Sequence, residues 1–245
     1  MIDLLEEVIV TPRRSFPRLP DLQVIERPGW LQIITPSITT GALNGVVYSL
    51  LDEASADAAI DGAIAMYRDI GVKFRWNVAP GSGPDDLGQR LERRGLVASW
   101  GRGMARSTDV DGRIGDVVEV DASTLDDYTR VQAVGWSFDR DALHTLHEHT
   151  LAEGRHRLFV AYCDGEPVAA ASYVPFTRSA YLMGGVVLPA YRGRGLYRAL
   201  VHARLVHAHA RGIALATSHA REATSAPILE KLGFETVCRF PMYFG

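Results

Sequence analysis

The chain has 245 residues, enough for one large domain or two small ones. Hydrophobic residues make up 47% of it and charged residues 22%, a composition typical of a globular protein with a real apolar core. The net charge of -3 gives no support to a nucleic-acid or membrane partner, and no segment approaches the roughly 20 apolar residues of a membrane span. The first residues lack a basic leader region, so we expect a cytoplasmic protein.

The first half predicts an alternation of strands and helices after an irregular arm. The first thirty residues hold four prolines among mixed charges, which favours irregular chain or short strands. Apolar runs predict strands at 30–35, 43–51, 72–78 and 96–104. Helical apolar spacing predicts helices at 56–70 and 85–94. We expect Ser55 to cap the first of these helices at its start and Gly71 at its end.

The second half follows a polar stretch at 107–115, which we expect to be a linker between domains at 1–110 and 111–245. Strands are predicted at 117–120, 157–163, 167–174, 180–188 and 213–217. Helices are predicted at 124–134, 140–151, 195–211 and 226–232. Asp164 and Gly165 form a strong turn signal between the second and third strands of this half.

The two halves share a short repeat. The string Leu-Glu-Arg-Arg-Gly-Leu-Val begins at Leu91, and Leu-Glu-Lys-Leu-Gly-Phe-Glu begins about 138 residues later, at Leu229. Met104 and Met242 have the same spacing. This pattern favours duplication of one domain, although two amphipathic helices that end in glycine can also look alike by chance.

The most informative stretch runs from Val187 to Leu200. A strand-like apolar run stops at Pro189, a short basic loop with two glycines follows, and the apolar spacing then becomes helical. The N-terminus of a helix leaves N–H groups unpaired and carries partial positive charge, so with Arg192 and Arg194 it suits an anion such as a pyrophosphate. The ordinary alternative is a strand-to-helix turn with solvated arginines.

The string Val-x-Pro-x-Tyr-Arg-Gly-x-Gly resembles motif A of the GNAT acyltransferase superfamily. The resemblance extends from about residue 117 to the end of the sequence and includes Glu-Lys-Leu-Gly-Phe, which begins at Glu230. The paired halves resemble tandem GNAT proteins in which only one half is catalytic. The resemblance implies an α/β (α+β) fold with two GNAT-like, mixed, twisted sheets flanked by helices. We expect the C-terminal sheet to be complete and the N-terminal half to be degenerate.

The resemblance also implies an acyl-CoA, expected to be acetyl-CoA, as co-substrate. The pantetheine arm is then expected along Gly185, Val186 and Val187. The pyrophosphate is expected on the backbone of the loop, formed by Arg192, Gly193, Arg194, Gly195, Leu196 and Tyr197. Tyr197 stands where the family pattern has a small residue, which puts the detailed path of the phosphates in doubt.

The residues that usually act as base and acid in this family are replaced. Tyr181 stands where many members carry a glutamate, and Leu229 stands where a tyrosine is frequent. A tyrosine with a pKa near 10 is a poor base at neutral pH. The catalytic candidates are therefore His219, Ser218 and Tyr181, with His219 as a base acting through water. The alternative for His219 is a solvated loop histidine.

By the same resemblance, Trp136 and Phe138 are candidates for contact with the acceptor, or else pack in the core. His144 and His147 are spaced for a shared ligand, but no carboxylate or cysteine completes a set, so no metal site is expected. The predicted function is acyl transfer from acyl-CoA to a small amine or peptide-like amine. The alternatives are a non-catalytic acyl-CoA-binding module and transfer to a non-amine acceptor in a biosynthetic or resistance pathway. The oligomeric state stays open.

Overall fold

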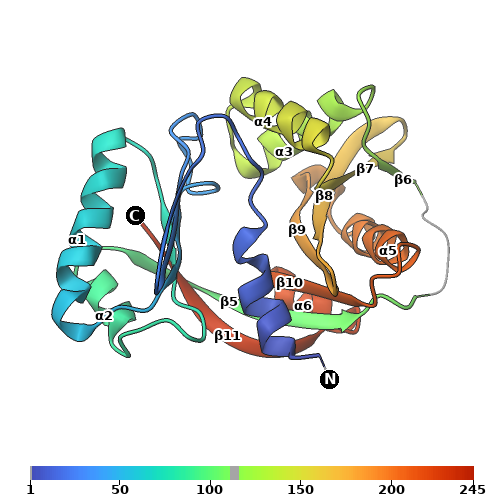
Figure 1. Cartoon of the computed structure of the whole chain (residues 1–245). Coiled ribbons are helices and arrows are strands. Elements are labelled where there is room, and N and C mark those ends of the chain that lie inside the picture. The colour runs from blue at the N-terminus through green and yellow to red at the C-terminus, as the bar shows by residue number, and fades with distance from the viewer. Residues whose placement is uncertain (1, 111–115) are drawn as a thin grey trace. The chain divides into compact units, whose positions relative to one another are not determined.

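A computed structural model describes residues 2–110 and 116–245 of the chain (Figure 1). The contacts divide these residues into two compact units. Unit 1 consists of the residues up to Arg18 together with Met104–His219 and Ile228–Val237. Unit 2 consists of Leu19–Gly103, Ala220–Pro227 and Cys238–Gly245. The predicted domain boundary at 110/111 stays a prediction, and residues 111–115 of the expected linker lie outside the described residues.

Unit 2 contains a sheet in the strand order β1-β2-β3-β4-β11. Only the β3–β4 pair is parallel. The strands and helices of this part of the chain are β1 (Gln23–Arg27), β2 (Trp30–Ile34), β3 (Gly45–Ser49), α1 (Glu53–Ile70), β4 (Arg75–Asn77), α2 (Leu87–Glu92), β5 (Val97–Ser107) and β11 (Glu235–Phe244). Both β5 and β11 contribute residues to the two units. The linker expected at 107–115 was wrong at its start, because Ser107 is the last residue of β5.

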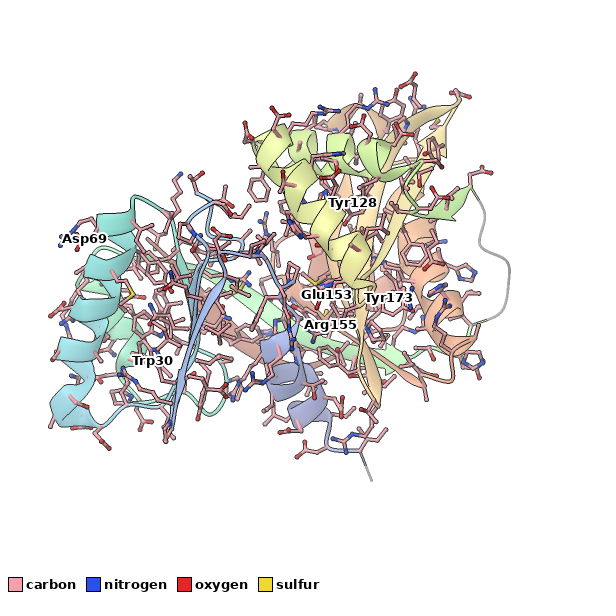
Figure 2. The ribbon with its side chains drawn as sticks, turned by 45° about the horizontal axis from the view of Figure 1, so that its top comes forward. Trp30, Asp69, Tyr128, Glu153, Arg155 and Tyr173 are labelled. Atoms are coloured by element: carbon pink, nitrogen blue, oxygen red, sulfur yellow. The ribbon has the colours of Figure 1, made fainter. Side chains whose placement is uncertain are left out.

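The core of unit 2 is aromatic. Trp76 is fully buried and donates a hydrogen bond from Nε1 to Ser49 Oγ at 2.9 Å. Its ring meets the edge of Trp30, which is labelled in Figure 2, with 5.4 Å between the ring centroids. Tyr67 from α1 stacks on Phe74 and completes this cluster. Burial of such large rings supplies much of the stabilisation that holds α1 against the sheet.

The start of α1 differs from the prediction. The helix begins at Glu53, and Asp52 occupies the cap position with an extended backbone. Ser55 therefore lies inside the first turn, where its hydroxyl donates to the carbonyl of Asp52 at 3.3 Å. An aspartate just before a helix is favoured by the helix dipole, which explains why the earlier residue takes this place. The predicted end is confirmed, because Gly71 has φ 77° and its N–H bonds the last turn.

Unit 1 is built on strands in the order β10-β9-β8-β7-β6, of which only the pair β9–β10 is parallel. Its first residues form two short helical turns, at Glu6–Val10 and Thr11–Arg14. The regular elements are β6 (Val117–Glu119), α3 (Leu125–Trp136), α4 (Arg140–Glu153), β7 (Arg157–Cys163), β8 (Glu166–Pro175), β9 (Ser179–Val187), α5 (Leu196–His209), β10 (Leu215–Arg221) and α6 (Ser225–Lys231). The expected fold class is confirmed as a mixed α/β protein with a twisted open sheet flanked by helices. The two separate sheets that were expected are not found, because the strands of the described residues belong to one sheet.

Two helical layers enclose the central strands of unit 1. In Figure 1, β8 and β9 pass between the pair α3/α4 and the helix α5. The face toward α3 is a continuous apolar cluster that includes Tyr128, Val131 and Val186. Gly135 allows α3 to approach closely, because a Cβ at that position would lie 2.2 Å from Val186 Cγ2. The sheet is therefore held rigidly at β9, where the motif begins.

The sequence repeat corresponds to matching elements. α2 begins at Leu87 and α6 at Ser225, and the strands that follow them begin at Val97 and Glu235, both about 138 residues apart. Between helix and strand, both Gly95 and Gly233 adopt a left-handed conformation, with φ 84° and 82°. Glycine is the residue that takes this conformation without strain, which explains why both copies carry it. Helix, glycine and strand thus recur at one spacing.

Candidate functional site

The basic glycine loop connects β9 to α5. After β9 ends at Val187, a single helical turn (Pro189–Tyr191) leads to Arg192, which has an extended backbone. Gly193 and Gly195 then turn the chain with φ 78° and 81°, and Gly195 caps α5. The first bond that closes the helix is from Ala199 N–H to the Gly195 carbonyl at 3.0 Å. The amides of the preceding three residues are therefore not used by the helix, which makes this end suitable for an anion.

Both loop arginines are exposed and held by neighbouring groups. The Nε of Arg192 donates to the carbonyl of Val187 at 3.2 Å, which ties the loop back to the end of β9. The guanidinium of Arg194 lies 5.2 Å from the centre of the Tyr191 ring and contacts Cys163 Sγ at 3.8 Å. The two cations thus stand beside the amides of the helix start, where they add positive charge for a bound phosphate group.

A basic pocket of about 630 Å³ adjoins the loop at Gly195. Its wall from α5 includes Arg198 and His202, and its opposite wall includes Lys231 and Arg106. Arg106 is fixed by hydrogen bonds to backbone carbonyls, one of them that of Leu232. The basic side chains of this pocket extend the positive surface of the loop along α5.

Beside the loop, the parallel strands β9 and β10 diverge. They pair from Ser179 with Leu215 as far as Leu182 with Ser218. β9 continues beyond its last pair with β10 to Val187. The backbone of Gly185, Val186 and Val187 therefore lies on a stretch of β9 that β10 does not pair with, as expected for residues that bind an extended ligand by backbone hydrogen bonds.

A β-bulge lies at the start of this diverging stretch. Ala170 pairs with Val186 and Ser172 pairs with Met183, so Gly184 and Gly185 oppose the single residue between them on β8. Gly184 has φ 63°, the left-handed conformation typical of the first glycine in such a bulge. The extra residue interrupts the ladder and leaves carbonyl groups that need other hydrogen-bond donors.

Buried side chains supply these donors, and the sequence did not predict them. Arg204 of α5, only 2% exposed, donates from Nη1 to the carbonyl of Ser172 at 3.0 Å and to that of Met183 at 3.4 Å. From α3, Gln132 donates from Nε2 to the carbonyl of Gly184 at 2.8 Å. A signal existed in the sequence: Arg204 lies one turn after Leu200 on the apolar stripe of a predicted helix, where a charged residue is unexpected.

Burial shifts the pKa values of the groups around the bulge. It lowers the pKa of Arg204 to about 10, so the guanidinium stays charged at neutral pH. It raises the pKa of Tyr128, labelled in Figure 2, to about 12, and it also raises the pKa of Tyr197. The ring of Tyr197 lies against Gly185, where an added Cβ would be 3.0 Å from Tyr197 Cε2. The bulky residue of the motif therefore packs beside β9.

The structure brings two of the three catalytic candidates together. The ring of His219 meets the edge of Tyr181, with 5.1 Å between the centroids, and its Nε2 lies 2.7 Å from the carbonyl oxygen of Val8. Because a carbonyl only accepts, Nε2 carries the proton in this contact. Ser218 is nearly buried, and its hydroxyl donates to the carbonyl of Leu182 at 2.9 Å. The catalytic roles of all three residues stay predictions.

The segment that contacts His219 was not expected in this place. Glu7 is 2% exposed. Its carboxylate accepts a hydrogen bond from Ser179 Oγ at 2.6 Å and forms an ion pair with Arg178, with 2.6 Å between Nε and Oε1. These contacts hold the first helical turn against the beginning of β9 and bring the next residue, Val8, to His219. The sequence near Glu7 carries no signal for this arrangement, because its partners lie far away in the chain.

The acceptor candidates lie at the end of α3. Trp136 is its last residue and packs against the apolar cluster that contains Val186. Ser137 follows with φ 57°, a left-handed conformation that is uncommon for serine, and Phe138 bonds back to the helix through its N–H. Trp136 and Phe138 are both partly exposed, so each offers an aromatic surface while it also packs. Their contact with an acceptor stays a prediction.

Within the described residues, no helix has the length and hydropathy that a bilayer crossing requires. The described side chains also contain no group of three histidine, cysteine, aspartate or glutamate residues close enough to share a metal ion. What the described residues do combine is a helix N-terminus with free amides, a basic rim and a diverging strand edge. This combination defines an α/β protein whose site is suited to a ligand that carries phosphate groups and an extended arm.

Comparison with known proteins agrees with this class. Residues 122–234 match the family model described as acetyltransferase (GNAT) family. A search of curated proteins finds no match. Residues 122–234 therefore form a domain of the GNAT superfamily, as the motif predicted.

Solved structures resemble nearly the whole chain at low sequence identity. A functionally unknown conserved protein from Staphylococcus epidermidis ATCC 12228 is 13% identical with a TM-score of 0.69, over 92% of this chain and 94% of that one. A tandem GNAT protein from the clavulanic acid biosynthesis pathway is 14% identical with a TM-score of 0.61, over 99% and 93%. A GCN5-related N-acetyltransferase from Kribbella flavida is 13% identical with a TM-score of 0.66, over 98% and 93%. These similarities concern the fold.

Proposed function

We propose that the protein is an acyl-CoA-dependent N-acyltransferase that transfers an acetyl group from acetyl-CoA to a small amine or a peptide-like amine. The observation that carries this proposal is the glycine loop at the start of α5, beside the strand edge that follows the bulge of β9. The GNAT acetyltransferase match of residues 122–234 supports acyl transfer from a CoA thioester. The cytoplasm as location, the absence of a required metal and the absence of nucleic-acid or membrane partners belong to the same proposal.

The loop and the strand edge would bind different parts of the co-substrate. The amides at the start of α5, with Arg192 and Arg194, would hold the pyrophosphate. The backbone of Gly185, Val186 and Val187 would pair with the amide groups of the pantetheine arm, in the manner of an added strand. The bound arm would then place the thioester at the point where β9 and β10 separate.

The reaction requires an amine that has lost its proton. Its nitrogen forms a bond to the thioester carbonyl carbon and the carbon–sulfur bond breaks. The nitrogen gives up one proton to the base, and CoA leaves as a thiolate that takes up one proton through water. A thiol with a pKa of roughly 8.5 leaves readily, so Leu229 in place of an acid costs little. His219 is the base we propose, acting through water. In the neutral ring, its bond to the Val8 carbonyl fixes the tautomer that carries the proton on Nε2, so that Nδ1 is the accepting nitrogen.

A second candidate function is a non-catalytic module that binds acyl-CoA. Two features favour it: Tyr181 replaces the glutamate that many GNAT members use as base, and the hydroxyl of Ser218 is occupied by a strand carbonyl. Transfer to a non-amine acceptor, such as an alcohol, uses the same binding site and is the third candidate. All three candidates bind acyl-CoA, and they differ in whether the acyl group is transferred and to which acceptor.

Release of free thiol from acetyl-CoA separates the candidates. The purified chain would be incubated with acetyl-CoA and a panel of small amines, peptides and alcohols, while a chromogenic disulfide reagent detects CoA thiol. We expect acceptor-dependent release with at least one amine, and product masses increased by one acetyl group. Tight binding of acetyl-CoA without turnover on any acceptor would contradict the enzyme proposal and favour the binding module. Absence of binding would contradict both.

A further inference from the structure

The bulge of β9 is held by a buried charge that has no acidic partner among the described residues. Arg204 is 2% exposed, and its hydrogen bonds within this part of the chain go to the backbone carbonyls of Leu200, Ser172 and Met183. Burying a guanidinium without a carboxylate is costly, and an apolar side chain of similar length could fill the same space without that cost. Packing of α5 against the sheet therefore does not explain why an arginine occupies this position.

The carbonyls that Arg204 contacts explain why an arginine occupies this position. The bulge removes the carbonyl of Met183 from the regular ladder, and Ser172 Oγ also donates to this oxygen, at 3.4 Å. On the other face, Gln132 satisfies the next carbonyl, that of Gly184. Gln132 is itself nearly buried, and its Nε2 also lies 3.4 Å from the hydroxyl of Tyr128. Donors from α5 and α3 thus hold two successive carbonyls of β9 from opposite faces of the sheet.

Holding a carbonyl also fixes the amide beside it. The peptide unit is planar and trans, so the N–H of each unit points away from its C=O. When Gln132 holds the carbonyl of Gly184, the N–H of Gly185 must point to the opposite side of the strand. When Arg204 holds the carbonyl of Met183, the N–H of Gly184 is fixed in the same way. These are the units that lead directly into the unpaired edge of β9.

We infer that Arg204 and Gln132 are positioning residues that clamp the bulge of β9, so that the edge at 185–187 is pre-formed for the pantetheine arm of the acyl-CoA. The inference rests on the proposed function, because it takes the arm to lie on that edge. The clamp acts on the arm and leaves the nucleotide end of the ligand untouched. The pyrophosphate loop begins beyond Val187, and among the described residues the hydrogen bonds of Arg204 and Gln132 go to other parts of the chain. Pre-forming an edge increases affinity by reducing the ordering that binding requires.

Two ligands separate the arm from the nucleotide end. CoA contains both parts, whereas adenosine 3′,5′-bisphosphate contains no pantetheine and binds only through the loop and its basic rim. Calorimetric titration would measure both affinities for the wild type, Arg204→Met and Gln132→Met. We expect each variant to bind CoA about tenfold more weakly, the loss typical of one charge-assisted or buried hydrogen bond, with an unchanged affinity for the bisphosphate. The double variant should lose less than the product of the two effects, since both act on one bulge.

Controls keep structural damage apart from positioning. Arg211→Met removes an exposed arginine just after α5 and should leave both affinities unchanged. Arg204→Lys keeps the charge but has a single donor group, and it should restore part of the CoA affinity. If Arg204→Met does not fold, Gln132→Met decides alone, because it removes the amide without changing charge. Equal losses for CoA and the bisphosphate, or no loss for either, would overturn the inference. A wild type that binds neither ligand would overturn the proposed function itself.

Discussion

Acid is expected to destabilise unit 1 through one buried histidine. His147 of α4 is 7% exposed, its Nδ1 lies 2.9 Å from Thr129 Oγ1, and its ring meets the edge of Tyr128. Burial lowers the pKa of His147 from 6.5 to about 3 in the folded protein, with a smaller contribution from His144. Below pH 6.5 the His147 ring therefore binds a proton in the unfolded chain but stays neutral in the folded protein. The stability from this group is complete above pH 6.5 and decreases as the pH falls toward 3.

The size of this effect follows from the two pKa values. At pH 5.0 an unfolded histidine with a pKa of about 6.5 is almost fully protonated, whereas folded His147 is not. This group alone therefore lowers the free energy of unfolding by about 2 kcal/mol relative to pH 7.5. His147→Asn keeps a polar atom near Thr129 but cannot titrate. Urea titrations would measure the free energy of unfolding at both pH values. Its decrease from pH 7.5 to pH 5.0 should be about 2 kcal/mol smaller in this variant than in the wild type.

Two controls test the assignment to His147. His149→Asn changes an exposed histidine of the same helix, and its acid-induced loss should equal that of the wild type. Proton NMR of the histidine rings would follow the titration of His147 directly. The reasoning is refuted if the ring of His147 titrates near pH 6.5 in the folded protein, or if the wild type and His147→Asn lose the same stability between the two pH values.

Three further substitutions test the loop and the strands. Arg192→Glu should weaken CoA binding by at least tenfold, because it places a negative charge beside the phosphates; calorimetry would show it, and unchanged affinity would contradict the ligand placement. Gly184→Ala should lower the free energy of unfolding by about 1–2 kcal/mol and should also weaken CoA binding. Its control is Gly212→Ala, since Gly212 is also left-handed but has open space around it, and this variant should lose stability without losing CoA affinity. Gly135→Ala should destabilise by about 1–3 kcal/mol through the clash with β9, whereas Gly62→Ala in α1 should be neutral or stabilising; thermal melts would compare them.

The basic glycine loop could be predicted because the features that form it are local. Gly193 and Gly195 turn the chain with positive φ, and the helix spacing begins directly after them. Such features depend on neighbouring residues only, so the residue types reveal them. The repeat is local in the same sense, since a helix that ends in a left-handed glycine before a strand leaves the same short string in both copies.

The parts that were missed depend on contacts between distant residues. Glu7 holds the first helical turn to β9 through Ser179, about 170 residues away in the chain, in a region where four prolines favoured irregular structure. Gln132 and Arg204 act on the same bulge from two helices. The sequence shows a polar residue on each apolar stripe, but not the carbonyl that it satisfies. Tertiary hydrogen bonds of this kind override the local pattern.

Binding and chemistry are therefore encoded differently in this chain. The proposed phosphate binding uses backbone amides, which any sequence that forms the loop provides, so the replacement at Tyr197 leaves the loop intact. Proton transfer requires particular side chains, and the ring of Tyr181 meets that of His219, whose Nε2 bonds a carbonyl of the first helical turn. A loop of this sequence would look the same in a catalytic and a non-catalytic protein. Only the side chains around Tyr181 distinguish the two, and a test of turnover must therefore start there.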